Sequence, residues 1–150
     1  MKNTRNLKNY SVIALGLAFL SLINIIFELF FGELNKELIN ASIPEGSPEN
    51  IVLITKVFVL VVSLFIILPQ IYIGFKGIKI AKNPNRSIGH IIWGIILVVF
   101  TAGALITPFL ALIKGEGEAL ANASELLSIG VDVFVLVEYV KYAIAVRNEN

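Results

Sequence analysis

Four long apolar stretches occupy most of this sequence, and each is about long enough to cross the ~30 Å hydrocarbon core of a bilayer as an α-helix. They cover residues 10–31, 51–75, 87–113 and 126–146. Because lipid offers no hydrogen bonds to the backbone, segments of this kind are confined to helices. The sequence therefore predicts an all-α integral membrane protein, a single domain over residues 1–150 with four transmembrane helices in an antiparallel up-down bundle.

The distribution of charge predicts how this bundle is oriented. Only 15% of the residues are charged, whereas a soluble domain carries about 25%. The outer loops, residues 32–50 and 114–125, are rich in glutamate. Basic residues instead gather at the N-terminus, in the inner loop 76–86 and near the C-terminus: Lys2, Arg5, Lys8, Lys76, Lys79, Lys82, Arg86, Lys141 and Arg147. The positive-inside rule then predicts a multi-pass protein of the cell membrane with both termini in the cytoplasm.

Residues that carry catalytic chemistry are scarce. There is no cysteine, which excludes disulfides, thiolate catalysis and Cys-based metal sites. The single histidine, His90, follows the basic inner loop, and we expect an interfacial residue rather than a ligand. No phosphate-binding glycine loop, nucleophile elbow or metal-binding histidine pair is present. The sequence thus predicts no enzyme, no metal or other cofactor, and no nucleic-acid partner.

Polar and small residues form a line along one face of three predicted helices. In a membrane such a face is expected to point toward other helices, where small residues permit close approach and polar groups find partners. Pro69 and Pro108 are expected to kink their helices. The three lines are Leu17, Ser21, Asn24, Glu28 and Gly32; Lys56, Ser63, Gln70, Gly74 and Gly77; and His90, Gly94, Thr101, Ala104 and Pro108.

The fourth predicted helix carries charges within its apolar stretch, namely Asp132, Glu138 and Lys141. Each charge near the centre of a membrane helix costs roughly 2.5–3.5 kcal/mol on insertion scales, whereas an apolar residue contributes only about 0.3–0.6 kcal/mol. We therefore expect this helix to depend on the other three, or on a subunit partner, for shelter. The alternative is an amphipathic helix lying along the membrane surface.

Two groups of intramembrane residues are candidate binding sites. Lys56 and Asp132 fall at similar predicted depths, with Glu28 within reach, which suggests an ion cluster between helices; the alternative is that Lys56 extends to the outer headgroups. Glu138 precedes Lys141 by three residues, a spacing that permits a salt bridge. Alternatively, Glu138 forms a proton or cation site together with two residues of the same inner half, Tyr139 and Gln70.

The length and four-span topology resemble those of the membrane glutathione-transferase group, but Lys56 and Gln70 stand in place of that group's Arg, Asn and Glu signature. The chain is also similar in topology to the small multidrug transporters. Their membrane glutamate is central, however, whereas Glu28 lies near the outer edge. Claudin-like and tetraspanin-like proteins need outer-loop cysteines. The sequence therefore assigns no family.

Two functional hypotheses remain. The first is a non-catalytic helix bundle that serves as an accessory, regulatory or protective component by associating with itself or with another membrane protein. The second is a small proton- or cation-coupled transporter or channel that uses the intramembrane carboxylates. Besides the lipid bilayer itself, anionic lipid at the inner basic loop is a further predicted partner, at about 1 kcal/mol per basic residue.

Overall fold

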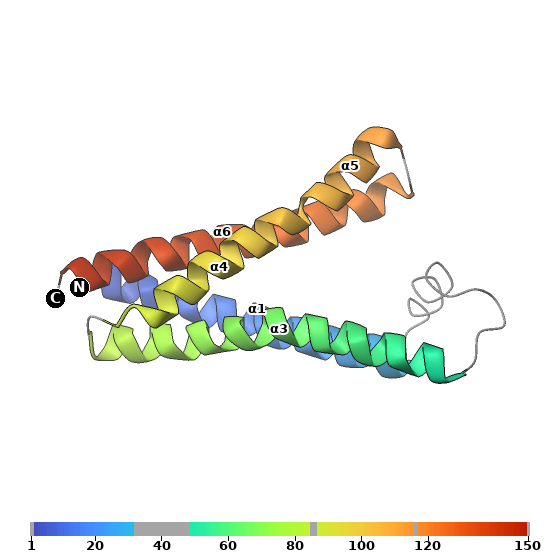
Figure 1. Ribbon diagram of the computed structural model, residues 1–150. Helices are drawn as coiled ribbons and strands as arrows, with labels where there is room; N and C mark the ends of the chain where they lie inside the picture. The colour runs from blue at the N-terminus through green and yellow to red at the C-terminus, as the bar shows by residue number, and fades with distance from the viewer. Residues whose placement is uncertain (1, 32–48, 85–86, 116, 150) are drawn as a thin grey trace. The chain divides into compact units, whose positions relative to one another are not determined.

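The computed structural model describes residues 2–31, 49–84, 87–115 and 117–149, and all regular secondary structure among them is α-helical (Figure 1). Inside the helices, the side chains of residues 28–31, 49–52, 55, 56 and 59 lie outside the description. The predicted all-α class is confirmed. The helices are α1 (Lys2–Phe31), α3 (Glu49–Lys82), α4 (Gly89–Ala104), α5 (Ile106–Lys114) and α6 (Ala119–Asn148).

Three stretches of the described helices are long and apolar enough to cross a membrane: Lys2–Phe27, Leu60–Lys82 and Gly89–Lys114. Their length and composition support a membrane protein. The sequence of α6 is less apolar because Asp132, Glu138 and Lys141 interrupt it. A fourth crossing therefore stays a prediction.

Several helices extend beyond the predicted apolar stretches. α1 begins at Lys2 instead of residue 10, because Leu7 is fully buried and its packing holds the basic segment in helical form. α3 continues to Lys82, so that residues 76–82 of the predicted inner loop are helical. α6 begins at Ala119 rather than residue 126, so that the preceding connection is shorter than predicted. Alanine and leucine at the start of α6 are strong helix formers, which accounts for the added turns.

The predicted helix over residues 87–113 is interrupted at Leu105, which separates α4 from α5. The cause is Pro108, which has no N–H group to donate to the carbonyl of Ala104, four residues earlier. Pro69, in contrast, lies inside the continuous helix α3. α5 ends at Gly115, whose φ of 69° is a left-handed conformation that glycine adopts without strain.

The chain divides into two compact units, and each is described by itself. Unit 1 contains Met1–Leu17 and Pro69–Asn150, and unit 2 contains Ala18–Leu68. In unit 1, the start of α1 and the end of α3 pack with α4 and α6, and α6 runs beside α4 and α5 (Figure 1). Unit 2 holds the other halves of α1 and α3, where Ala18 and Ile67 are buried.

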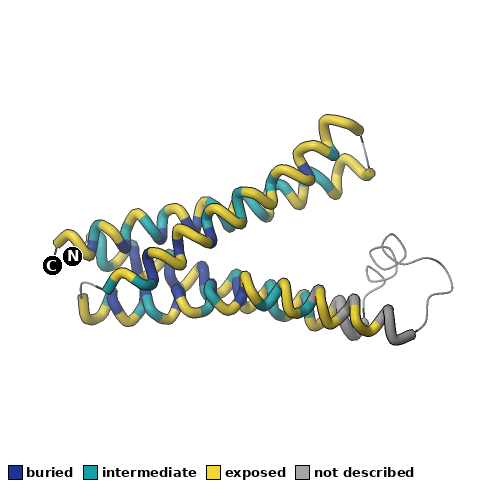
Figure 2. The backbone as a smooth tube through the Cα atoms, in the orientation of Figure 1, coloured by how far each residue is buried: buried dark blue, intermediate teal, exposed yellow. Residues whose placement is uncertain are grey.

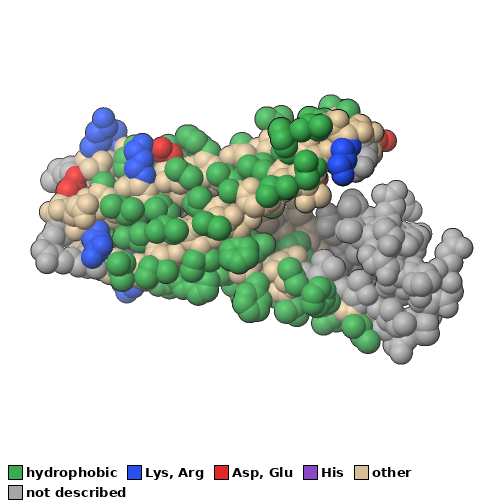
Figure 3. Space-filling model, turned by 45° about the horizontal axis from the view of Figure 1, so that its top comes forward, with side chains coloured by type: hydrophobic (Ala, Val, Ile, Leu, Met, Phe, Trp, Pro, Cys, Tyr) green, Lys and Arg blue, Asp and Glu red, His purple; other side chains and the backbone are tan. Residues whose placement is uncertain are grey.

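The core of unit 1 lies where four helices face one another (Figure 2). Its buried positions recur every three or four residues, the spacing that places side chains on one face of a helix. In α1 these are Leu7, Ser11 and Ala14, and in α6 they include Leu136, Tyr139, Ala143 and Val146. Hydrophobic side chains also cover much of the outer surface, whereas several Lys and Arg side chains of unit 1 lie toward the end that holds both termini (Figure 3).

Candidate functional site

The centre of unit 1 is the ring of Tyr139, a side chain of α6 that is fully buried. The ring fits between two glycines from different helices. A Cβ atom placed on Gly77 of α3 would lie 2.7 Å from Cε2 of Tyr139, and one placed on Gly94 of α4 would lie 3.3 Å from Cε1. The missing side chains at both positions therefore create the space that the ring occupies. This explains why glycine stands in the two predicted polar lines of these helices.

Ser11 of α1 completes this packing. It is fully buried, and its Oγ donates a hydrogen bond of 2.6 Å to the carbonyl of Leu7 on its own helix. The same Oγ would overlap a Cβ atom on Gly77, and the backbone of Ser11 lies 3.2 Å from the Cβ position of Gly74. Small residues thus bring α1 and α3 close together, as is common at helix interfaces in membranes.

His90 lies in the same core, only 1% exposed, on the α4 face that also carries Gly94. Its ring meets that of Tyr139 edge to face, with centroids 6.2 Å apart. Both imidazole nitrogens and the hydroxyl of Tyr139 are buried, and none has a hydrogen-bond partner among the described residues. His90 is therefore buried between helices, whereas its expected depth at the membrane interface stays a prediction. Its polar atoms remain available for a ligand.

A second polar group lies farther along unit 1. Gln70 of α3 is 6% exposed, and its amide nitrogen donates to the carbonyl of Ala14 on α1 over 3.4 Å. The Gln70 side chain also reaches the carboxyl group of Asp132 on α6. One carboxylate oxygen of Asp132, Oδ1, is buried and has no partner among the described residues. The structure thus brings together two predicted site residues that the sequence had placed in separate groups.

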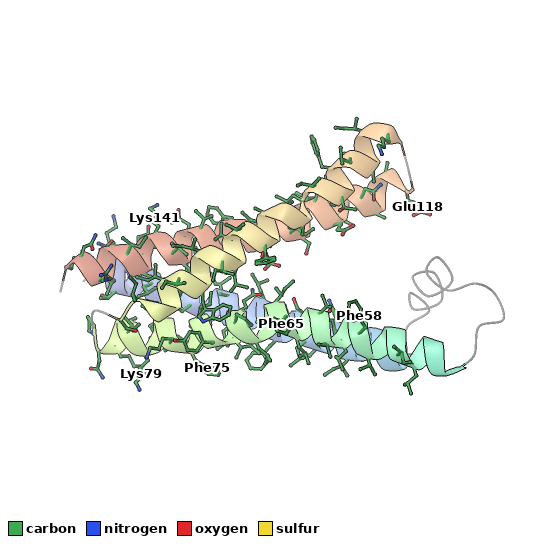
Figure 4. The ribbon with its side chains drawn as sticks, viewed as in Figure 1. Phe58, Phe65, Phe75, Lys79, Glu118 and Lys141 are labelled. Atoms are coloured by element: carbon green, nitrogen blue, oxygen red, sulfur yellow. The ribbon has the colours of Figure 1, made fainter. Side chains whose placement is uncertain are left out.

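Glu138 forms the salt bridge with Lys141 that their spacing predicted, at 2.9 Å between Oε1 and Nζ. Lys141 is 60% exposed while Glu138 is 17% exposed, and Lys141 projects outward from α6 (Figure 4). The lysine also lies 5.2 Å from the ring centre of Tyr142. Glu138 therefore has a partner on its own helix, on the side of α6 that faces away from the core.

The remaining predicted site residues belong to unit 2. The side chains of Lys56 and Glu28 lie outside the described residues, so the ion cluster with Asp132 stays a prediction. Asn24 of α1 is exposed, whereas its predicted role was in a buried seam. The inward face of α1 carries Ala14 and Ala18 instead, which lie about 80° and about 120° around the helix from Asn24 at 100° per residue.

Searches with protein-family models, among curated proteins and among solved structures find no match to this chain. No family is assigned. No group of three or more metal-ligating side chains occurs among the described residues. Functional conclusions therefore depend on the packing and polar chemistry of the helices themselves.

Sequence reasoning had placed His90, Gly77 and Gly94 on polar lines, but it had not identified their common contact with Tyr139. The signal that could have found it is the pairing of two small residues, on adjacent helices, with one large aromatic residue on a third. Lys76, which acts electrostatically on His90, had been assigned only to the basic inner loop.

Proposed function

We propose that this chain is a four-crossing helix bundle of the cell membrane that serves as a non-catalytic accessory, regulatory or protective component. In this proposal it associates with itself or with another membrane protein, and both termini lie in the cytoplasm. The observation that carries the association is Asn24, a polar side chain exposed on an apolar helix. Other observations support the two remaining parts of the proposal, namely the crossing of the membrane by α6 and the cytoplasmic location of both termini.

The contact between the chain ends supports a fourth crossing. Asn3 of α1 donates a hydrogen bond to Glu149 beyond α6, and Tyr10 stacks on Tyr142 with ring centroids 5.6 Å apart. Both ends of the chain therefore lie at one end of unit 1 (Figure 1). Three crossings would leave the start of α6 on the opposite side of the membrane. A return crossing by α6, about 45 Å long at 1.5 Å per residue, brings the ends together.

The basic residues support a cytoplasmic location for this end. Exposed cations of α1, α3 and α6 lie there, and the two described carboxylates nearest the C-terminus, Glu138 and Glu149, already have partners in Lys141 and Asn3. The positive-inside rule assigns such an end to the cytoplasm. The surface also suits contact with anionic headgroups. The exposed cations are Lys2, Arg5, Lys8, Lys79, Lys82, Lys141 and Arg147.

Asn24 lies seven residues before the end of α1 at Phe31, about 10 Å along the helix axis. Ile23, Ile26 and Phe27 around it are also exposed, so the surrounding surface suits acyl chains. An amide in hydrocarbon lacks hydrogen-bond partners, and an amide on a neighbouring subunit provides them. Asn24 is therefore the residue on which we expect association to depend most.

The experiment compares Asn24→Leu with Leu20→Ala, a matched change at an exposed apolar position one turn earlier. Fluorescence energy transfer between labelled copies in bilayers measures self-association, and crosslinking in native membranes measures association with other proteins. A contact of this kind contributes about 0.6–2 kcal/mol, so Asn24→Leu should weaken association roughly 3- to 30-fold. Equal association of both variants, or a strictly monomeric parent without partners, would contradict the proposal.

A second candidate function is a small proton- or cation-coupled transporter or channel, and the observation that favours it is Asp132. This carboxylate points into unit 1 and has an oxygen without a described partner, which is unusual for a group inside a membrane protein unless it serves a function. Glu138, in contrast, is paired with Lys141. In proteoliposomes, Asp132→Asn should abolish a proton or cation flux that Glu138→Gln preserves. A flux that survives Asp132→Asn would exclude Asp132 as the coupling residue.

A further inference from the structure

The start of α4 is an electropositive position at the end of unit 1 that carries both chain termini. α4 begins at Gly89, and the residue before it, Ile88, provides no side-chain cap for the helix. The first turn of an α-helix carries a partial positive charge from its N–H groups, equivalent to roughly half an elementary charge. Anions are stabilised at such positions when further donors surround them.

Independent polar groups converge on this helix start. His90 is the second residue of α4, and side chains in a helix lean toward its N-terminus, so its buried imidazole lies over the first turn. Lys76 of α3, half-buried, acts electrostatically on that imidazole. The hydroxyl of Tyr72 lies 3.7 Å from the Cβ position of Gly89. Tyr139 approaches from α6 with a buried hydroxyl.

We propose that this cluster is a binding site for a phosphate group. The oxyanion accepts hydrogen bonds from the imidazole N–H of His90 and from the hydroxyl of Tyr139, two buried groups that lack partners among the described residues. Lys76 and the start of α4 supply positive charge. A bound cation would meet repulsion from both, so the electrostatics of the site select an anion.

No described carboxylate is placed to occupy the site. Glu138 is paired with Lys141, and Glu149 accepts a hydrogen bond from Asn3. Asp132 lies seven residues before Tyr139 on α6, about 10 Å along the helix. None of the described residues therefore supplies the required anion, and we take it to come from solution or from the membrane. Phosphate chemistry has two sources at this position, namely soluble inorganic phosphate and the headgroup of a phospholipid.

The test uses the full chain in maltoside micelles, which contain no phosphate. Because His90 is the only histidine, ¹⁵N-histidine labelling gives NMR signals from this one imidazole. One arm adds inorganic phosphate against chloride at matched ionic strength, and the other adds phosphatidylglycerol against an uncharged glycolipid. A saturable shift of the imidazole signals is expected in at least one arm, and the responding arm identifies the source.

Three variants separate binding from general charge effects. Lys76→Gln removes the neighbouring cation, and Tyr139→Phe removes only the hydroxyl. Lys79→Gln is the matched control, since Lys79 lies on the same helix but projects outward from it (Figure 4). The loss of a hydrogen bond to a charged group supports an expected affinity loss of about tenfold or more for Tyr139→Phe, and removal of the nearby positive charge should weaken binding to a similar extent in Lys76→Gln.

Lys79→Gln should retain the affinity of the parent. Signals that fail to move in both arms would overturn the proposal, as would equal affinities for Lys76→Gln and Lys79→Gln. The NMR signal of His90 does not depend on self-association or on ion flux. A failure of the phosphate proposal can therefore be distinguished from a failure of the proposed function.

Discussion

Gly77→Ala is expected to destabilise unit 1 although it adds only one methyl group. The new Cβ atom would overlap Oγ of Ser11 and lie 2.7 Å from Cε2 of Tyr139. Both side chains are fully buried, so a shift of either one would disturb the helices packed around it. Forcing an extra methyl group into a well-packed core costs about 1–3 kcal/mol. Alanine recovers up to about 1 kcal/mol through its better helix propensity.

The net loss is therefore about 0–2 kcal/mol, which corresponds to a factor of up to roughly 30 in the unfolding equilibrium. Reversible unfolding in mixed micelles, followed by fluorescence of the lone tryptophan Trp93, measures this change. Gly16→Ala is the matched control, because nothing lies within 4 Å of a Cβ atom at Gly16. That control should be more stable than the parent by about 0.5–1 kcal/mol.

A double variant tests which contact is responsible. Combining Gly77→Ala with Ser11→Gly removes both Oγ and Cβ of Ser11 while the ring of Tyr139 remains, so only part of the lost stability should return. Such coupling between residues in contact amounts to about 0.5–3 kcal/mol. If Gly77→Ala proved as stable as Gly16→Ala, the close packing inferred around Tyr139 would be wrong.

Three further predictions concern the connections between helices. Tyr10 and Tyr142 stack at 5.6 Å, so a double-mutant cycle to leucine should give a coupling of about 0.5–1.5 kcal/mol; no coupling would show that the stack contributes nothing. Pro108→Ala supplies an N–H for the carbonyl of Ala104, and this new amide at residue 108 should exchange its hydrogen slowly. Fast exchange of the new amide would mean that proline is not what separates α4 from α5. Gly115→Ala places a side chain at a φ of 69° and should lower the free energy of unfolding by about 1–2 kcal/mol. An unchanged free energy of unfolding would contradict the left-handed conformation at Gly115.

The long apolar stretches were sufficient to predict the helices of the described residues, because each stretch contains mostly apolar residues over several turns. The i+3 pairing of Glu138 with Lys141 was also predictable, since it depends only on helix geometry. The end of α4 was not placed, because the effect of Pro108 on the backbone depends on whether neighbouring packing retains a continuous helix.

The contacts between helices could be predicted only in part. Polarity selected Asn24 for the seam of α1, but the small residues Ala14 and Ala18 occupy the buried face. On α3 and α4, the same reasoning succeeded for Gly77 and Gly94. The difference arises because the contact face of α1 is selected by close approach, for which residue size matters more than polarity.

The contact that joins three helices is the insertion of Tyr139 between Gly77 and Gly94. A sequence gives the faces of individual helices, but the relative register of two helices depends on which side chains interlock. This is why the burial of His90 against the ring of Tyr139 was not predicted.

The central claim is that α6 returns through the membrane, so that both chain ends lie in the cytoplasm. The chain has no cysteine, and single substitutions Lys2→Cys, Glu118→Cys and Asn148→Cys therefore report on three positions without background. Labelling of intact cells with an impermeant thiol reagent should modify only Glu118→Cys, whereas Lys2→Cys and Asn148→Cys should react only after the membrane is opened. Modification of Asn148→Cys in intact cells that protect Lys2→Cys would contradict the account.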